Sequence, residues 1–361
     1  MRFHLPVNLY YEDNCIINHS RDIADMGTRA LIITGHSSGR NGARKDLFEA
    51  LEKENITWVL DEDVEQNPSV DSVMRLRDLG LANDCDFVIG VGGGSALDAA
   101  KAVAVMMLNP DKDRDYLFVS DPENLSLPVV SVPTTCGTGS EATPISVLTD
   151  PRQENKVSMT HKIFPDLSLV DDRYLASLPH GILCNTSIDA MGHMIEGLVN
   201  ARACVFSDIY AESGLKAWSR SRQVLLDASA RTPENIHNLM YASIMGGFTI
   251  AHTGTCLPHG FSYTPTYYLG MPHGKAVGYF TYGFLKYAPE SYQTRILDLT
   301  GFGCLEELRD FIAEATRAQR LDDAFLDKTI EIMKTNTGKI ASCPYPVDDE
   351  VLRKIAYAFE G

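Results

Sequence analysis

Apolar runs typical of buried strands alternate with helical patterns through the first half of the chain. The runs cover residues 29–35, 58–64, 87–91 and 127–133, and amphipathic helices are predicted between them over 45–54 and 72–82. Strands that alternate with helices are typical of a parallel sheet with helices on its faces. We therefore expect an α/β domain at the start of the chain.

Strand patterns fade after about residue 180, and helical periodicity replaces them. It extends over residues 187–199, 207–221, 232–252, 304–316 and 348–359, with Asp349 as the expected N-cap of the last helix. The sequence therefore predicts two domains, an α/β domain over residues 1–180 and an all-helical domain over 181–361, joined near residues 175–181.

The charge balance and the cysteine pattern exclude several classes of protein. Lys and Arg total 32 against 48 Asp and Glu, a net charge of −16, which disfavours nucleic acid as a partner. No apolar run reaches the length of a membrane span, and the first residues carry no export signal. The eight cysteines show no Cys-x-x-Cys spacing. We expect a cytoplasmic protein with reduced thiols that binds neither nucleic acid nor membrane.

Two glycine- and threonine-rich loops follow predicted strands. Glycines at a strand end let backbone approach a bulky anion, and the N-terminus of the next helix offers free N–H groups. Either loop alone is also consistent with an ordinary turn, but two after neighbouring strands favour a Rossmann-like nucleotide cleft. The first loop contains Gly92, Gly93, Gly94 and Ser95, and the second contains Thr134, Thr135 and Thr138.

The segment after the first predicted strand bears on the choice of dinucleotide. NAD enzymes place an acid here for the ribose hydroxyls. This chain has no acid at that point; it has Gly35, Ser37, Ser38 and Arg40. Hydroxyls and a guanidinium suit a 2′-phosphate, which favours NADP(H) over NAD(H). The alternative is a solvated loop.

One aspartate and three histidines have the spacing and chemistry of a metal site. Asp189 and His193 are four residues apart on a predicted helix and so share a face. His259 and His273 follow, each with a glycine after it. A carboxylate with three imidazoles suits Fe²⁺ or Zn²⁺ better than Mg²⁺ or Ca²⁺. Histidines held by core hydrogen bonds are the alternative. His252 is either an outer partner of the site or a packed core residue, and we favour the core residue.

Together, these motifs resemble the iron-containing (group III) alcohol dehydrogenases. The resemblance covers nearly the whole chain and rests on residues 92–101, 133–141, 150–156, 189–197 and the two histidine motifs at 259 and 273. It implies the dehydroquinate synthase-like fold of that family, with a nucleotide-binding α/β domain and an all-helical metal-binding domain, and a homodimer. NADP-dependent propanediol and butanol dehydrogenases are the most similar group.

The resemblance also implies roles for single residues. Asp189, His193, His259 and His273 match the metal ligands, and Gly93, Gly94 and Ser95 match the pyrophosphate cradle. Asp98 and Lys156 match groups near the nicotinamide and its ribose, although a surface lysine is the alternative for Lys156. Tyr263 stands where many relatives have a histidine. A phenol is a poor base at neutral pH but can donate a hydrogen bond or relay a proton. Asp98 and Tyr263 are thus the catalytic candidates.

The expected activity is hydride transfer between NADP(H) and small primary alcohols, diols or aldehydes. Phe248, Phe261, Tyr267 and Tyr268 would suit an unpolar substrate, and core packing explains each equally well. Alternatives are a glycerol dehydrogenase, a nucleotide-binding module without activity, and a sugar-phosphate cyclase resembling dehydroquinate synthase. The cyclase needs basic residues around a substrate phosphate, and the stretch from His259 to His273 has none.

Overall fold

The computed structural model describes residues 3–36 and 38–359, and the chain divides into two compact units. The α/β unit comprises Leu5–Thr135 and Gly139–Leu178. The helical unit comprises residues 179–359, residues 3 and 4, and the short segment Cys136–Thr138. A three-residue piece of the threonine-rich loop is therefore part of the helical unit.

The α/β unit is built on a six-stranded parallel sheet of order β1-β8-β5-β4-β2-β3. This confirms the parallel sheet expected from the sequence. Its strands are β1 (Asn8–Tyr11), β2 (Arg29–Thr34), β3 (Thr57–Asp61), β4 (Phe87–Gly92), β5 (Val129–Pro133) and β8 (Leu167–Val170). A separate antiparallel hairpin is formed by β6 (Val147–Asp150) and β7 (Asn155–Ser158).

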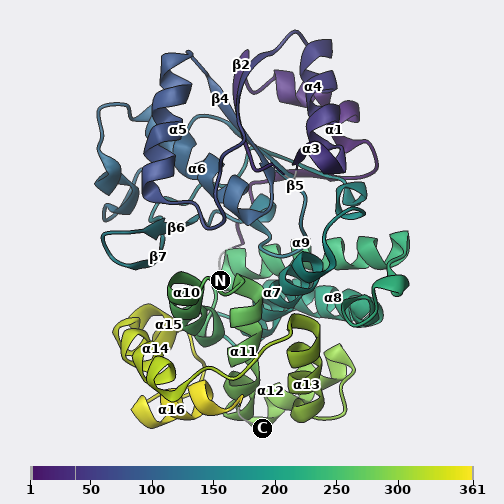
Figure 1. Cartoon of the computed structure of the whole chain (residues 1–361), viewed down its shortest axis with the longest axis vertical. Coiled ribbons are helices and arrows are strands. Elements are labelled where there is room, and N and C mark those ends of the chain that lie inside the picture. The colour runs from purple at the N-terminus through teal and green to yellow at the C-terminus, as the bar shows by residue number, and fades with distance from the viewer. Residues whose placement is uncertain (1–2, 37, 360–361) are drawn as a thin grey trace. The chain divides into compact units, whose positions relative to one another are not determined.

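Helices cover both faces of the sheet, which is why its central strands are mostly apolar. The helices α5 (Val70–Ala82) and α6 (Gly94–Leu108) pack on one face (Figure 1). The other face packs against α1 (Cys15–Asn18) and α4 (Ala43–Lys53), with the short α2 (Ser20–Ala24) and α3 (Ser38–Asn41) beside them. A Cβ on Gly90 of β4 would lie 3.0 Å from Ala100 Cβ, so glycine allows α6 its close approach.

The helical unit is arranged around α7 (His180–Leu198), which is buried at every residue from Ser187 to Leu198. It packs against α8 (Val205–Ser221), α9 (Pro233–Thr253), α10 (Leu257–Leu269) and α11 (His273–Lys286). Further along the chain are α12 (Glu290–Thr300), α13 (Leu305–Thr316), α14 (Asp323–Thr335), α15 (Thr337–Ala341) and α16 (Asp349–Tyr357). Because α7 is buried all round, its polar side chains lie inside the unit. None of the described helices is both long and apolar enough to cross a bilayer.

The expected N-cap of α16 was wrong by one residue. Asp348 caps this helix, because its carboxylate accepts a hydrogen bond of 2.9 Å from the backbone N–H of Val351. Asp349 is the first helical residue, where its charge favours the positive end of the helix dipole. Either of the two successive aspartates could cap the helix by its chemistry. Asp348 is the cap because its backbone is extended, as that of an N-cap residue is.

Candidate metal centre

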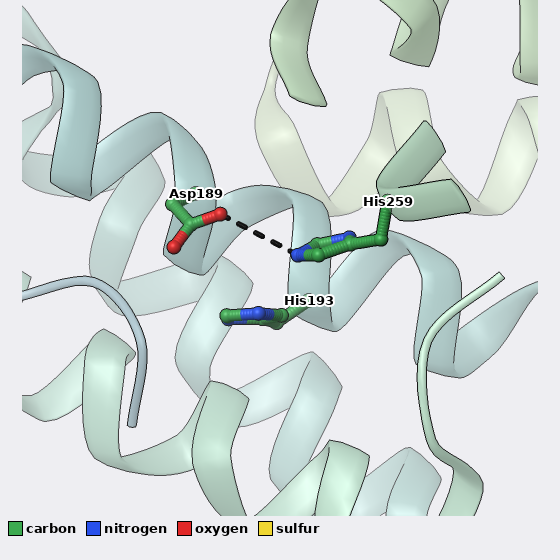
Figure 2. Close-up of side chains that lie close together, drawn as sticks. All are labelled: Asp189, His193 and His259. Carbon is green, nitrogen blue, oxygen red and sulfur yellow. Dashed lines mark ion pairs between the residues drawn. The ribbon is translucent and has the colours of Figure 1, made fainter. Parts of the chain in front are cut away.

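Two residues of α7 and one of α10 form a compact buried cluster. Asp189, His193 and His259 each have an exposed fraction of at most 4%, and one nitrogen or oxygen atom from each lies within 4.8 Å of the others. Asp189 Oδ1 is 3.4 Å from His259 Nε2, and Figure 2 shows the His193 ring beside this pair. The four-residue spacing on α7 therefore places the carboxylate and the imidazole together, as the sequence predicts.

His273, the first residue of α11, extends the cluster. Its Nε2 is 3.7 Å from Asp189 Oδ1, and the centroid of its ring is 5.2 Å from that of His259. Its exposed side-chain fraction is 21%, so it is less buried than the other three candidate ligands. All four candidate ligands from the sequence thus lie together in the helical unit.

Two atoms in the cluster are buried without a hydrogen-bond partner among the described residues. They are Asp189 Oδ1 and His259 Nε2, which face each other. Buried polar atoms without a partner are costly, and a cation between them would satisfy both. One carboxylate oxygen and three imidazole nitrogens also match the ligand types of Fe²⁺ and Zn²⁺. The residues present therefore fit a divalent transition metal.

Each histidine of the cluster is held through Nδ1, which leaves Nε2 for a metal. His193 Nδ1 is 3.2 Å from the carbonyl of Gly137, and His273 Nδ1 is 3.3 Å from the Ser262 hydroxyl. His259 Nδ1 is 2.5 Å from Glu196 Oε1. Such outer contacts fix the tautomer and the ring orientation of a ligand histidine.

Glu196 is a functional candidate that the sequence interpretation missed. It is fully buried on α7, and its second oxygen accepts a hydrogen bond from the backbone N–H of Cys256 at the start of α10. This carboxylate therefore ties α10 to α7 beside His259. Its signal in the sequence is the spacing His193-x-x-Glu196, which continues the polar face of an otherwise apolar helix.

Neighbouring groups set the protonation of the cluster. Burial alone would raise the pKa of Asp189, but the charges of His273 and His193 outweigh it and the pKa is lowered. Burial lowers the pKa of His193 to about 4. For His259 burial acts downward, but Glu196 and Asp189 raise the pKa overall. At neutral pH the cluster therefore offers an ionised carboxylate and a neutral His193, the forms that bind metals.

The two candidate phosphate loops meet in the α/β unit. Gly92 ends β4 with φ +152°, a conformation that favours glycine, and Gly93 precedes α6, which begins with Gly94 and Ser95. A Cβ on Gly93 would lie 3.2 Å from the Thr135 side chain, and the Thr134 N–H donates to Gly92 O at 2.8 Å. Thr138, by contrast, belongs to the segment that is part of the helical unit.

Asp98 and Lys156 occupy defined positions in the α/β unit. The Asp98 carboxylate accepts hydrogen bonds from the Ser140 hydroxyl at 2.6 Å and the Val147 N–H at 2.8 Å. Lys156 Nζ donates to Asn67 Oδ1 at 3.0 Å, and the Asn67 N–H donates to Ser95 Oγ at 3.1 Å. Asn67 therefore connects Lys156 with the glycine loop, whereas Asp98 holds the segment that follows the threonine loop.

The segment after β2 contains an acid that the local sequence does not reveal. Gly35 pairs with Asp63, which follows β3, and His36 Nε2 is 3.5 Å from Asp63 Oδ1. Ser38 is buried and donates to Gly35 O at 3.1 Å, whereas Arg40 is exposed. Ser37 lies outside the described residues. The contact with Asp63 arises from strand pairing between β2 and β3, so it could not be found from the residues after Gly35 alone.

Tyr263 lies one helical turn after His259 on α10. The centroid of its ring is 6.1 Å from that of His273, with the planes at 26°. Lys339 of α15 places its ammonium 5.9 Å from the centroid of the Tyr263 ring. Sequence interpretation missed this lysine because α15 is brought to α10 only by the tertiary fold.

The other aromatic candidates each contact a further aromatic ring. Phe261 is fully buried and stacks on Phe280 with centroids 4.9 Å apart. Tyr267 and Tyr268 contact each other edge to face, and Phe248 packs against Tyr210. His252 also stacks on an aromatic ring, that of Phe3. These contacts give no reason to place them around a substrate.

Family models match both parts of the chain. The model described as iron-containing alcohol dehydrogenase matches residues 6–172, and the model of the C-terminal region of the same family matches residues 183–339. The chain belongs to the iron-containing alcohol dehydrogenase family. This iron-containing alcohol dehydrogenase is accordingly an oxidoreductase, as the motifs implied.

Individual relatives agree with this assignment. A sulfoacetaldehyde reductase of Bilophila wadsworthia is 31% identical over 310 residues, which cover 83% of this chain and 78% of the relative. An NADPH-dependent butanol dehydrogenase of Clostridium saccharobutylicum is 28% identical over 283 residues, 76% of this chain and 71% of the relative. The crystal structure of an iron-containing alcohol dehydrogenase from Thermotoga maritima superposes with a TM-score of 0.90 at 31% identity, covering 99% of both chains.

Proposed function

We propose that this iron-containing alcohol dehydrogenase transfers hydride between NADP(H) and small primary alcohols, diols or aldehydes, with Fe²⁺ held by Asp189, His193, His259 and His273. The observation that carries the proposal is the buried cluster in which Asp189 Oδ1 and His259 Nε2 face each other without a hydrogen-bond partner among the described residues. A divalent metal at this point would supply Lewis acidity to the oxygen of an alcohol or aldehyde.

The protein's own residues hold and orient the reacting groups. Gly137, Ser262 and Glu196 fix the imidazole rings through Nδ1. The hydride itself is the chemistry of the nicotinamide, for which the protein supplies orientation. Tyr263 lies beside His273, and its phenol is our candidate for donating a hydrogen bond to the substrate oxygen or for passing its proton to water.

The decisive experiment is turnover by metal-free protein that is reloaded under anaerobic conditions. With Fe²⁺ bound, the protein should oxidise NADPH in the presence of butyraldehyde, and faster than it oxidises NADH. Protein reloaded with Zn²⁺ is the comparison for the metal, and glycerol is the comparison for the substrate. In H259A, metal retention and turnover should be lost together. Normal turnover in that variant would exclude the ligand set, and protein that binds NADPH and metal without turnover would point to a different reaction.

Cofactor preference rests on the segment after β2. We infer a preference for NADP(H) from the exposed Arg40 and from the absence of an acid directly after Gly35. Asp63 acts against a 2′-phosphate, since its carboxylate lies beside Gly35 and His36. We expect G35D to shift kcat/KM toward NADH and D63N to shift it toward NADPH. An unchanged ratio in both variants would mean that the 2′ position is recognised elsewhere.

A further inference from the structure

A lysine from α15 reaches the helix that carries His259. The Cγ of Lys339 lies 3.2 Å from the point that a Cβ on Gly260 would occupy, so glycine leaves space for its aliphatic stem beside α10. The ammonium donates a hydrogen bond to the Thr255 hydroxyl and lies 5.9 Å from the centroid of the Tyr263 ring. The structure thus brings a cation to a helix whose own sequence contains no lysine or arginine.

Both groups that the ammonium contacts are adjacent to the candidate metal centre. Tyr263 is one turn from His259, and its ring lies nearly parallel to that of His273. Thr255 precedes Cys256, whose N–H donates to Glu196, the partner of His259. The positive charge of Lys339 therefore lies beside Tyr263, the proposed hydrogen-bond donor to the substrate oxygen.

The ammonium has unused binding capacity. A lysine has three N–H donors, and among the described residues the acceptor for this ammonium is the Thr255 hydroxyl, while the charge of Glu196 acts on it from farther away. Burial of the ammonium lowers the pKa of Lys339, although the charge of Glu196 acts in the opposite direction, so the positive charge is costly where it lies. An anionic ligand would offset it.

We propose that Lys339 is a specificity-determining residue that binds an anionic group of the substrate, a carboxylate or a sulfonate, so that the preferred substrates are small aldehydes or alcohols bearing such a group. This inference rests on the proposed alcohol and aldehyde chemistry. It replaces the unpolar substrate expected from the sequence, where the stretch from His259 to His273 contains no lysine or arginine.

The test compares charged and neutral aldehydes of similar size. Specificity constants are measured for sulfoacetaldehyde, succinic semialdehyde and butyraldehyde with the Fe²⁺-loaded wild type, K339M and K339R. The ratio of anionic to neutral kcat/KM should fall about 10- to 100-fold in K339M, the scale of one charge-assisted hydrogen bond, and fall much less in K339R. As a matched control, K216M removes a charge from an exposed ion pair on α8 and should leave the ratio unchanged. The two anions distinguish a sulfonate site from a carboxylate site.

A second measurement needs no turnover. Calorimetric titration of propane-1-sulfonate should show binding to the wild type that is at least about tenfold weaker in K339M. An unchanged ratio and unchanged binding in K339M of normal iron content would overturn the proposal. A higher kcat/KM of the wild type for butyraldehyde than for either anionic aldehyde would also overturn the proposal. This measurement does not depend on whether K339M folds. Binding of the sulfonate without turnover of any aldehyde would contradict the proposed reaction and leave the anion site standing.

Discussion

Each imidazole of the candidate centre uses one ring nitrogen for the protein and leaves the other for a metal. The three acceptors at Nδ1 differ in kind: a backbone carbonyl for His193, a hydroxyl for His273 and a carboxylate for His259. Only the carboxylate carries a charge, and it is fully buried. Glu196 should therefore have a larger influence on metal binding than the other two acceptors.

We expect E196Q to weaken metal binding by about 10- to 100-fold, the usual effect of losing an outer carboxylate. The amide keeps the shape of the side chain but removes the charge that makes His259 a stronger donor. Chelator competition with Co²⁺ measures the affinity, and the visible spectrum of bound Co²⁺ reports the ligand field. E212Q on the surface of α8 is the matched control. Equal affinities and spectra in E196Q and wild type would reduce Glu196 to a packing role.

Glu141 makes stability depend on pH. It is 1% exposed, and burial raises its pKa from 4.5 to about 7. The unfolded chain therefore releases this proton at lower pH than the folded chain, so the contribution of Glu141 to stability decreases as pH rises from about 4.5 to about 7. E141Q removes this contribution and should gain about 1–3 kcal/mol relative to wild type across that window. Urea unfolding of both proteins at several pH values measures the difference in unfolding free energy. The same difference at every pH would contradict the prediction.

At the scale of elements, the crossing of α7 and α11 depends on Gly274. A Cβ at this position would lie 1.8 Å from the carbonyl oxygen of Asn185 on α7. Because backbone cannot yield as a side chain does, we expect G274A to destabilise the protein by about 1–3 kcal/mol or more and to displace His273. In G181A, where no atom lies within 4 Å of the added Cβ, the helix should instead be stabilised slightly. Urea midpoints of the two variants test the contrast, and equal shifts would refute it.

Elements with long apolar patterns were predictable, whereas short ones were not. The strands β4 and β5 are buried throughout and β2 at every residue but its first, and all three agree with their predicted runs within two residues at either end. The edge strand β1 and the strand β8 have four residues each, too few to show a pattern.

The candidate metal centre was predictable where a helix fixes the spacing of its residues, as for Asp189 and His193. Lys339 and Asp63 depend on contacts between distant segments, for which the sequence carries no local signal.

At the scale of the whole molecule, a bound metal would join three helices of the helical unit. Its candidate ligands come from α7, α10 and α11, so a metal that binds the folded chain alone adds to stability by mass action. At a free concentration 100 times its dissociation constant, the gain is about 2.7 kcal/mol. Scanning calorimetry with and without Fe²⁺ should show a higher midpoint for the loaded wild type and no shift for D189N. An equal shift in D189N would place the metal elsewhere.

The segment Cys136–Thr138 limits how this chain can be divided into working fragments. It is part of the helical unit although Thr135 and Gly139 on either side are part of the α/β unit, and it supplies the carbonyl that holds His193. A fragment that begins at Pro179 would contain every candidate metal ligand and still lack that carbonyl. A chimaera of two relatives joined at residue 179 would therefore take the carbonyl that holds His193 from a different parent than His193 itself. Residues 136–138 need to be transferred together with the C-terminal half.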